Sequence, residues 1–110
     1  MSFPLEEMLS KDSITVTKRG LTSFRSARKE VGTNAVEVCA GAEPISERAR
    51  LVIMSEDIIY IGSVGVTPEN GFVVLGGYEN RFTIDFDPRS PVSVYAIAEE
   101  PTHIRIWEEA

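Results

Sequence analysis

The sequence predicts an all-β protein, an antiparallel β-sandwich or barrel, on three observations. Short runs rich in β-branched and aromatic residues recur at a spacing of roughly 8 to 12 residues, with Gly, Pro or Asn between them. The segment 81–87, R-F-T-I-D-F-D, alternates apolar and polar residues with the period of two that a half-buried strand requires. No helical period of any length competes with these strand patterns.

The most apolar stretch, residues 50–61 (R-L-V-I-M-S-E-D-I-I-Y-I), predicts the centre of the core. Ser55, Glu56 and Asp57 interrupt it, which indicates two strands joined by a tight turn, that is, a hairpin. The side chains expected to face inward from the two strands are Leu51, Ile53, Ile59 and Ile61.

The N-terminal third is less regular. Residues 3–11 place four apolar side chains at helical spacing and predict at best a short helix, whereas 13–18 (S-I-T-V-T-K) alternates like a strand. The polar and basic segment 21–34 has too few large apolar residues to order itself, so it predicts either a long loop or an arm that folds against a partner. We therefore expect an N-terminal extended arm over 1–34 and a sandwich over 35–110.

The remaining strands follow from local pattern. Residues 35–40 and 72–75 predict short strands, and Asn70-Gly71 is the strongest turn signal in the chain. Residues 92–98 are apolar on both faces past Ser93, as in a central strand. In the last predicted strand, 102–108, two isoleucines alternate with His103, Arg105 and Trp107.

The composition of the chain limits the classes of function that it can have. A chain of 110 residues with a net charge of −6 predicts one domain and argues against nucleic acid, whose binding relies on Lys and Arg. The basic residues crowd the N-terminal third, where they could face an acidic surface. Cys39, the only cysteine, lies in an apolar run and predicts a buried, inert thiol. We expect no membrane helix and no secretory signal.

The chain offers few candidates for chemistry. Its only histidine, His103, excludes a multi-histidine metal site and is interpreted as a surface or edge-strand residue. Asp85 and Asp87 share a strand face, but with no third oxygen donor they indicate a solvated face rather than a calcium site or glycosidase pair. Trp107 predicts an interface or packing residue, with sugar stacking as the alternative.

The run from Arg48 to Ile106 resembles a domain common in small bacteriophage virion proteins. The resemblance covers about half of the chain and consists of strand and turn signatures rather than a chemical motif. Its elements are Arg50-Leu51-Val52-Ile53, Tyr60-Ile61-Gly62, Val66-Thr67, Leu75-Gly76-Gly77, Phe82-Thr83-Ile84, Val94-Tyr95-Ala96-Ile97-Ala98 and Ile104-Arg105-Ile106. The resemblance implies a jelly-roll-like sandwich used as a building block in capsid decoration, head-tail junction or fibre proteins.

These observations lead to one main expectation. The protein is expected to be a non-enzymatic virion structural protein, made in the host cytoplasm, that acts as a capsid decoration or cement protein. It is expected to form a homo-oligomer, with a trimer favoured, and to contact other virion proteins such as the major capsid protein. No catalytic residue, cofactor or metal is expected. The residues expected at the interface are Phe24, Arg25, Arg28, Lys29 and Trp107.

Two alternatives stay open. The first keeps the fold but makes the protein a carbohydrate- or receptor-binding module of a tail or fibre, with Trp107, Tyr78 and Tyr95 as stacking residues. The second is an enzyme, for which the chain shows only isolated candidate groups.

Overall fold

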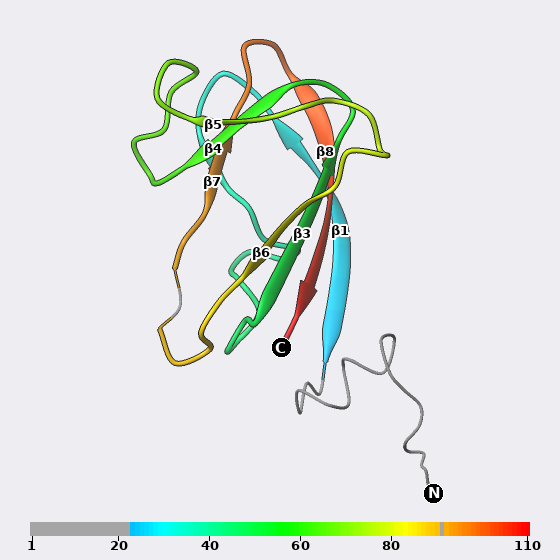
Figure 1. The fold of residues 1–110 in the computed structure, drawn as a ribbon, viewed down its shortest axis with the longest axis vertical. Coiled ribbons are helices and arrows are strands. Elements are labelled where there is room, and N and C mark those ends of the chain that lie inside the picture. Colours follow the sequence, from blue (N-terminus) through cyan, green and yellow to red (C-terminus); the bar gives the residue numbers. More distant parts are fainter. Residues whose placement is uncertain (1–22, 91) are drawn as a thin grey trace, which may run out of the picture.

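Eight strands form the protein, and no helix lies between them in the part of the chain that the structure describes. The structure is a computed structural model and describes residues 23–90 and 92–110. The strands are β1 (Phe24–Val31), β2 (Val36–Glu37), β3 (Arg50–Ser55), β4 (Ile59–Gly62), β5 (Phe72–Val74), β6 (Phe82–Asp85), β7 (Tyr95–Ile97) and β8 (Thr102–Glu109). Figure 1 shows them as two packed layers.

The strands pair into two four-stranded antiparallel sheets, with the orders β1-β8-β3-β6 (sheet A) and β2-β7-β4-β5 (sheet B). Strands that follow one another in the chain lie in opposite sheets, except for β4 and β5, so the chain passes back and forth between the layers. This order is that of an eight-stranded jelly roll. The predicted antiparallel, jelly-roll-like sandwich is therefore confirmed.

The core lies between the sheets and consists of the inward positions that the alternation predicts. Leu51, Ile53, Ile59 and Ile61 are all buried, as expected. They pack with inward side chains of the neighbouring strands, namely Val74, Ala96, Ile104 and Ile106. β7 pairs on both sides, so the prediction of a central strand within 92–98 is also confirmed.

The predicted hairpin over 50–61 is wrong in its pairing. β3 belongs to sheet A and β4 to sheet B, so the residues between them form a corner that crosses from one layer to the other. The Ser55 hydroxyl donates to the Asp57 carbonyl (2.6 Å), and the Glu56 amide donates to the His103 carbonyl (3.1 Å), which turns the chain out of sheet A. The two apolar halves thus meet across the core instead of side by side.

The prediction of a loop or arm over 21–34 is wrong for residues 24–31, because these form β1. This strand pairs along its whole length with β8, from Phe24 opposite Glu109 to Val31 opposite Thr102. The sandwich therefore begins before residue 35. The predicted helix over 3–11 and strand over 13–18 lie outside the described residues.

Candidate binding surfaces

A buried charge cluster fastens the loop after β2 to sheet A. Glu108, on β8, is fully buried and its carboxylate accepts hydrogen bonds from Arg25 Nε and Arg48 Nη1, both at 2.7 Å. The amides of Ala40 (3.1 Å) and Ile45 (3.4 Å) donate to the same carboxylate. The four donors satisfy a buried charge that would otherwise be strongly unfavourable.

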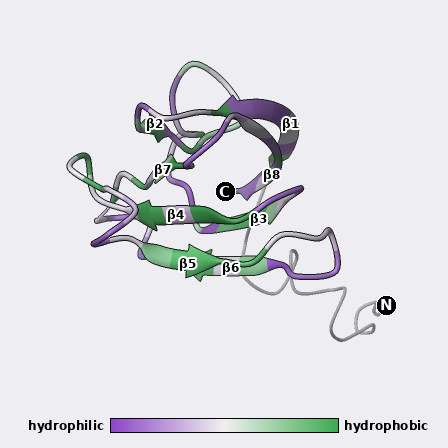
Figure 2. Cartoon of the chain, turned by 90° about the horizontal axis from the view of Figure 1, so that it is seen from above, coloured by the Kyte–Doolittle hydropathy of each residue, from purple (hydrophilic) through white to green (hydrophobic). Residues whose placement is uncertain are grey.

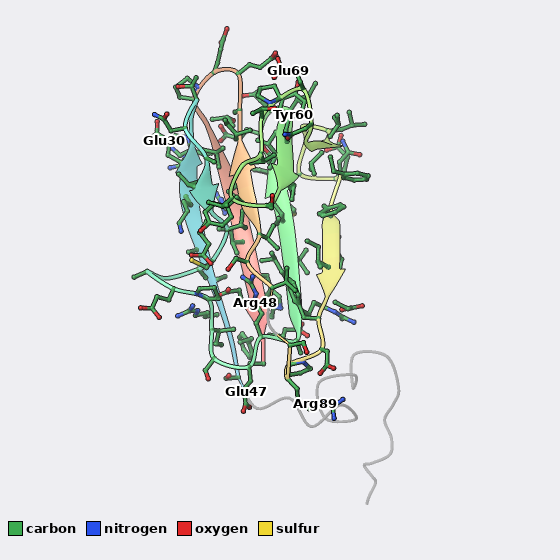
Figure 3. All side chains as sticks on the ribbon, turned by 90° about the vertical axis from the view of Figure 1, so that its left-hand side faces the viewer. Glu30, Glu47, Arg48, Tyr60, Glu69 and Arg89 are labelled. Carbon is green, nitrogen blue, oxygen red and sulfur yellow. The ribbon has the colours of Figure 1, made fainter. Side chains whose placement is uncertain are left out.

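Arg48, which enters this cluster, directly follows a residue with an unusual backbone conformation. Glu47 adopts a left-handed conformation, with φ 57°, and this turn directs its own side chain outward and that of Arg48 into the body of the sandwich (Figure 3). There Arg48 also donates to the Val38 carbonyl (2.8 Å) and lies 4.8 Å from the centre of the Phe86 ring. Its guanidinium thus joins β8 of sheet A to the segment that follows β2.

The cluster makes stability depend on pH. Burial by itself raises the pKa of Glu108, but hydrogen bonds from Arg25, the Ala40 amide and Arg48 outweigh it and lower the pKa below its ordinary value of 4.5. A carboxyl group with a lowered pKa in the folded state stabilises the protein above its unfolded-state pKa. This contribution is lost as the pH falls through the folded-state pKa.

We therefore expect the difference in unfolding free energy between the native protein and Glu108→Gln to be constant near neutral pH and to shrink below about pH 4.5. Urea denaturation between pH 7 and pH 3 measures it. Glu69→Gln, at an exposed position labelled in Figure 3, is the matched control. A difference that does not change over this range would contradict the role given to the Glu108 charge.

Two of the basic residues predicted at an interface have partners within the chain. Arg25 binds Glu108 and the Glu43 carbonyl, and Lys29 Nζ donates to the Glu37 carbonyl at 3.1 Å and lies 3.6 Å from Cys39 Sγ. They bridge β1 to the segment that carries β2, and so cover this edge of the sandwich with polar side chains. Cys39 is buried, as predicted.

Phe24, Arg28 and Trp107 lie on the outer face of sheet A, where contact with another molecule remains a prediction. The Phe24 and Trp107 rings are stacked, with centroids 4.7 Å apart and planes at 14°. Arg28 is half exposed and lies 3.9 Å from the Glu56 carboxylate.

Beside Trp107 the outer face of sheet A is hollowed. This hollow, the Trp107 hollow, has a volume of about 520 Å³ and is lined by Arg50, Val52, Met54, Tyr78, Arg81, Thr83, Trp107 and Glu109. It thus combines aromatic rings with donors and one carboxylate. Tyr95 lies on β7 in the other sheet, so the structure brings together only two of the three predicted stacking residues, Trp107 and Tyr78.

Glu109 lies at the border of this hollow and was not predicted. One carboxylate oxygen, Oε2, accepts a hydrogen bond from Trp107 Nε1 at 2.8 Å. The other, Oε1, is buried and has no hydrogen-bond partner among the described residues. Glu109 therefore fixes the orientation of the Trp107 ring.

The other candidates for chemistry have simple partners. His103 is on β8, an inner strand rather than an edge strand, and its Nδ1 lies 4.0 Å from Glu56. Arg50 binds Asp85 at 2.8 Å, and Asp87 binds Arg89 at 3.2 Å, both on the exposed surface. In residues 23–90 and 92–110, no three His, Cys, Asp or Glu side chains gather as a metal site would require, and no helix there is long and apolar enough to cross a membrane.

The opposite edge of the sandwich, formed by β5 and β6, is apolar. Figure 2 shows hydrophobic residues at this edge and hydrophilic ones along β1 at the other. An open groove of about 400 Å³ runs between the two sheets here. We call this surface the apolar edge, and its residues are Ile61, Phe72, Phe82, Ile84, Phe86, Val92 and Val94.

Several of these side chains are more exposed than is usual for their kind. Phe72 is 62% exposed and touches Phe82, with the ring centroids 5.3 Å apart, and Val92 is 60% exposed. Ile84 and Phe86 are only partly buried although they pack against the core. No residue of β5 lines the groove, which lies between β6 and the segments 61–63 and 92–94, and the core is accessible from the side there. Sequence alternation predicted one strand face for Phe82, Ile84 and Phe86 but not that the edge is open.

No protein-family model matches the sequence, and searches of curated proteins and of solved structures likewise found no match.

Proposed function

We propose that this protein is a non-enzymatic bacteriophage virion structural protein, a capsid decoration protein that stabilises the shell through contacts with the major capsid protein and with its own copies. The observation that carries this proposal is the apolar edge. Large apolar side chains that gather on a surface mark contacts with other proteins. The jelly roll is compatible with the proposal because viral capsids use this architecture, although a fold alone does not determine a function.

The proposed mechanism is mechanical. A protein that binds only the assembled shell lowers the free energy of that shell relative to separated subunits. Burying one exposed Phe or Val side chain contributes about 1.5–3 kcal/mol, so a few side chains of the apolar edge suffice for a firm contact when many copies act together. The polar β1 edge leaves the apolar edge as the favoured side for this contact.

We expect the purified protein to bind expanded phage capsids at a fixed stoichiometry and to form a homo-oligomer, with a trimer as the first expectation. Cosedimentation and light scattering measure the two properties. Phe72→Glu should weaken both at least tenfold, because it places a charge in the apolar edge. Ile58→Glu, an exposed apolar residue of the β3–β4 corner, is the matched control and should change neither. Equal effects of the two variants, or no binding and no oligomer, would contradict the proposal.

The Trp107 hollow favours a second candidate function, the binding of a carbohydrate by a tail or fibre module. Sugars bind to aromatic faces and to side chains that donate or accept hydrogen bonds, and the hollow offers Trp107 and Tyr78 together with Arg81 and Thr83.

On this hypothesis the protein binds a glycan array saturably, and Trp107→Ala abolishes binding. Tyr95→Ala, in the other sheet, is the control and should leave binding unchanged. Circular dichroism should show that Trp107→Ala is folded, because the substitution also removes the stack on Phe24. An array without saturable binding would remove this candidate and leave the decoration proposal in place.

A further inference from the structure

The groove lies between β6 and the segments 61–63 and 92–94, and each sheet ends at the apolar edge in a strand with one side without a described partner. β6 pairs only with β3, and β5 pairs only with β4, so both present free backbone donors and acceptors at the apolar edge. An apolar groove flanked by an open strand edge, here that of β6, is suited to an extended segment, which pairs through its backbone and places alternate side chains in the groove. We therefore expect the edge to bind a strand whose apolar residues recur at a period of two.

This chain contains such a segment outside the described residues. Residues 13–18, S-I-T-V-T-K, place Ile14 and Val16 on one face and hydroxyl side chains on the other. We propose that the segment 13–18 of a second copy of this chain pairs at the apolar edge, with Ile14 and Val16 in the groove. This inference deepens the proposed function, on which it rests, because it names what covers the edge when copies assemble.

The place where the described chain begins favours a second copy over the same molecule. Ser23 is bound to Ala110 at the start of β1, with N–O distances of 3.0 and 2.9 Å, and β1 is at the far side of sheet A from β6. A strand added beyond β6 lies four strand spacings from β1, about 19 Å. The five residue steps from Lys18 to Ser23 span about 18 Å at full extension. The linker of the same chain is thus barely long enough to bring segment 13–18 to the apolar edge. This length does not limit the segment of a neighbouring copy.

The inferred contact joins different surfaces of two molecules, since a segment that leaves at the β1 edge of one copy binds the β5–β6 edge of another. Such a heterologous contact closes into a ring when the rotation between copies permits. A trimer is one such ring. Reciprocal exchange between two copies is another closed arrangement.

Cysteine crosslinking in the full chain tests the inference. Cys39→Ala removes the native thiol, and Val16→Cys and Val92→Cys are then placed in separate molecules. After mixing and mild oxidation we expect a covalent heterodimer of Val16→Cys with Val92→Cys. Ile58→Cys, at a position that is 47% exposed against 60% for Val92 and lies away from the groove, replaces Val92→Cys as the control and should give at least tenfold less heterodimer. Denaturation curves should confirm that the Cys39→Ala background is folded.

Each other outcome overturns the inference. A doubly substituted chain that crosslinks within itself in dilute solution would show that the segment covers its own edge. Equal crosslinking to Val92→Cys and Ile58→Cys, or none, would show that the segment does not bind the groove. If an oligomer sensitive to Phe72→Glu persists in that case, the inference fails while the proposed function stands. If the protein neither associates nor binds capsids, the proposed function fails with it.

Discussion

Replacing Glu108 with glutamine should lower the free energy of unfolding by about 3–5 kcal/mol, which is the usual effect of removing one partner from a buried ion pair. Glutamine keeps the shape of the side chain but leaves the Arg48 guanidinium, 3% exposed, without its counter-charge. Stabilities of small domains are about 5–15 kcal/mol, so the variant should be close to the limit of folding. Urea denaturation followed by tryptophan fluorescence measures the change.

An exposed ion pair is the matched control. Arg50 and Asp85 are 2.8 Å apart, close to the 2.7 Å between Arg48 and Glu108, but Asp85 is more than half exposed. Asp85→Asn should therefore change the unfolding free energy by only about 0–1 kcal/mol.

The double variant Arg48→Met with Glu108→Leu removes both buried charges and should recover most of the stability, because apolar side chains of similar volume often replace buried ion pairs without loss. Equal effects of Glu108→Gln and Asp85→Asn would show that the buried cluster contributes nothing beyond a surface pair.

The inward position of Glu108 could have been predicted from the sequence but was not. Ile104 and Ile106 define the inward register of β8, and the same period of two places Glu108 inward as well. An acid in that register requires a buried base, and Arg48 supplies it from a distant part of the chain. The signal is present in the alternation, but the sequence analysis assigned only Ile104 and Ile106 to the apolar face of this strand and no role to Glu108.

Alternation predicted which side chains face the core, but it does not determine which strands pair. Leu51, Ile53, Ile59 and Ile61 face inward both in a hairpin and in a corner that joins two sheets. The choice depends on contacts with β6, β8, β5 and β7, which are distant in sequence.

The strand β1 was missed for a different reason. Its sequence, F-R-S-A-R-K-E-V, has little apolar area, so burial alone predicts no ordered element. Its order comes from pairing with β8, from the bonds of Arg25 to Glu108 and the Glu43 carbonyl, and from the bond of Lys29 to the Glu37 carbonyl of β2. Such stabilisation depends on residues that are distant in the sequence and is not visible in local composition. The Trp107 hollow and the open edge depend in the same way on the assembled sandwich.

Replacing Gly76 with alanine should destabilise the corner between β3 and β4. A methyl group at this position would lie 2.7 Å from the Glu56 carbonyl oxygen and 2.8 Å from the Asp57 Cα, both backbone atoms of the corner. The neighbouring residue is already fixed, because the Gly77 amide donates to the Ser55 carbonyl at 2.8 Å. Relief of the clash requires the corner or the 76–80 segment to move, which costs about 1–3 kcal/mol.

Gly65→Ala is the matched control for Gly76→Ala, because a methyl group at Gly65 would have no neighbour within 4 Å. We expect a change of about 0.5 kcal/mol or less in its unfolding free energy. Hydrogen exchange of the Gly77 amide adds a local measurement, since the bond to Ser55 should open more often in Gly76→Ala alone. Similar stability and exchange in the two variants would mean that segment 76–80 does not hold the corner. The crossing from sheet A to sheet B would then depend on the Ser55 and Glu56 hydrogen bonds alone.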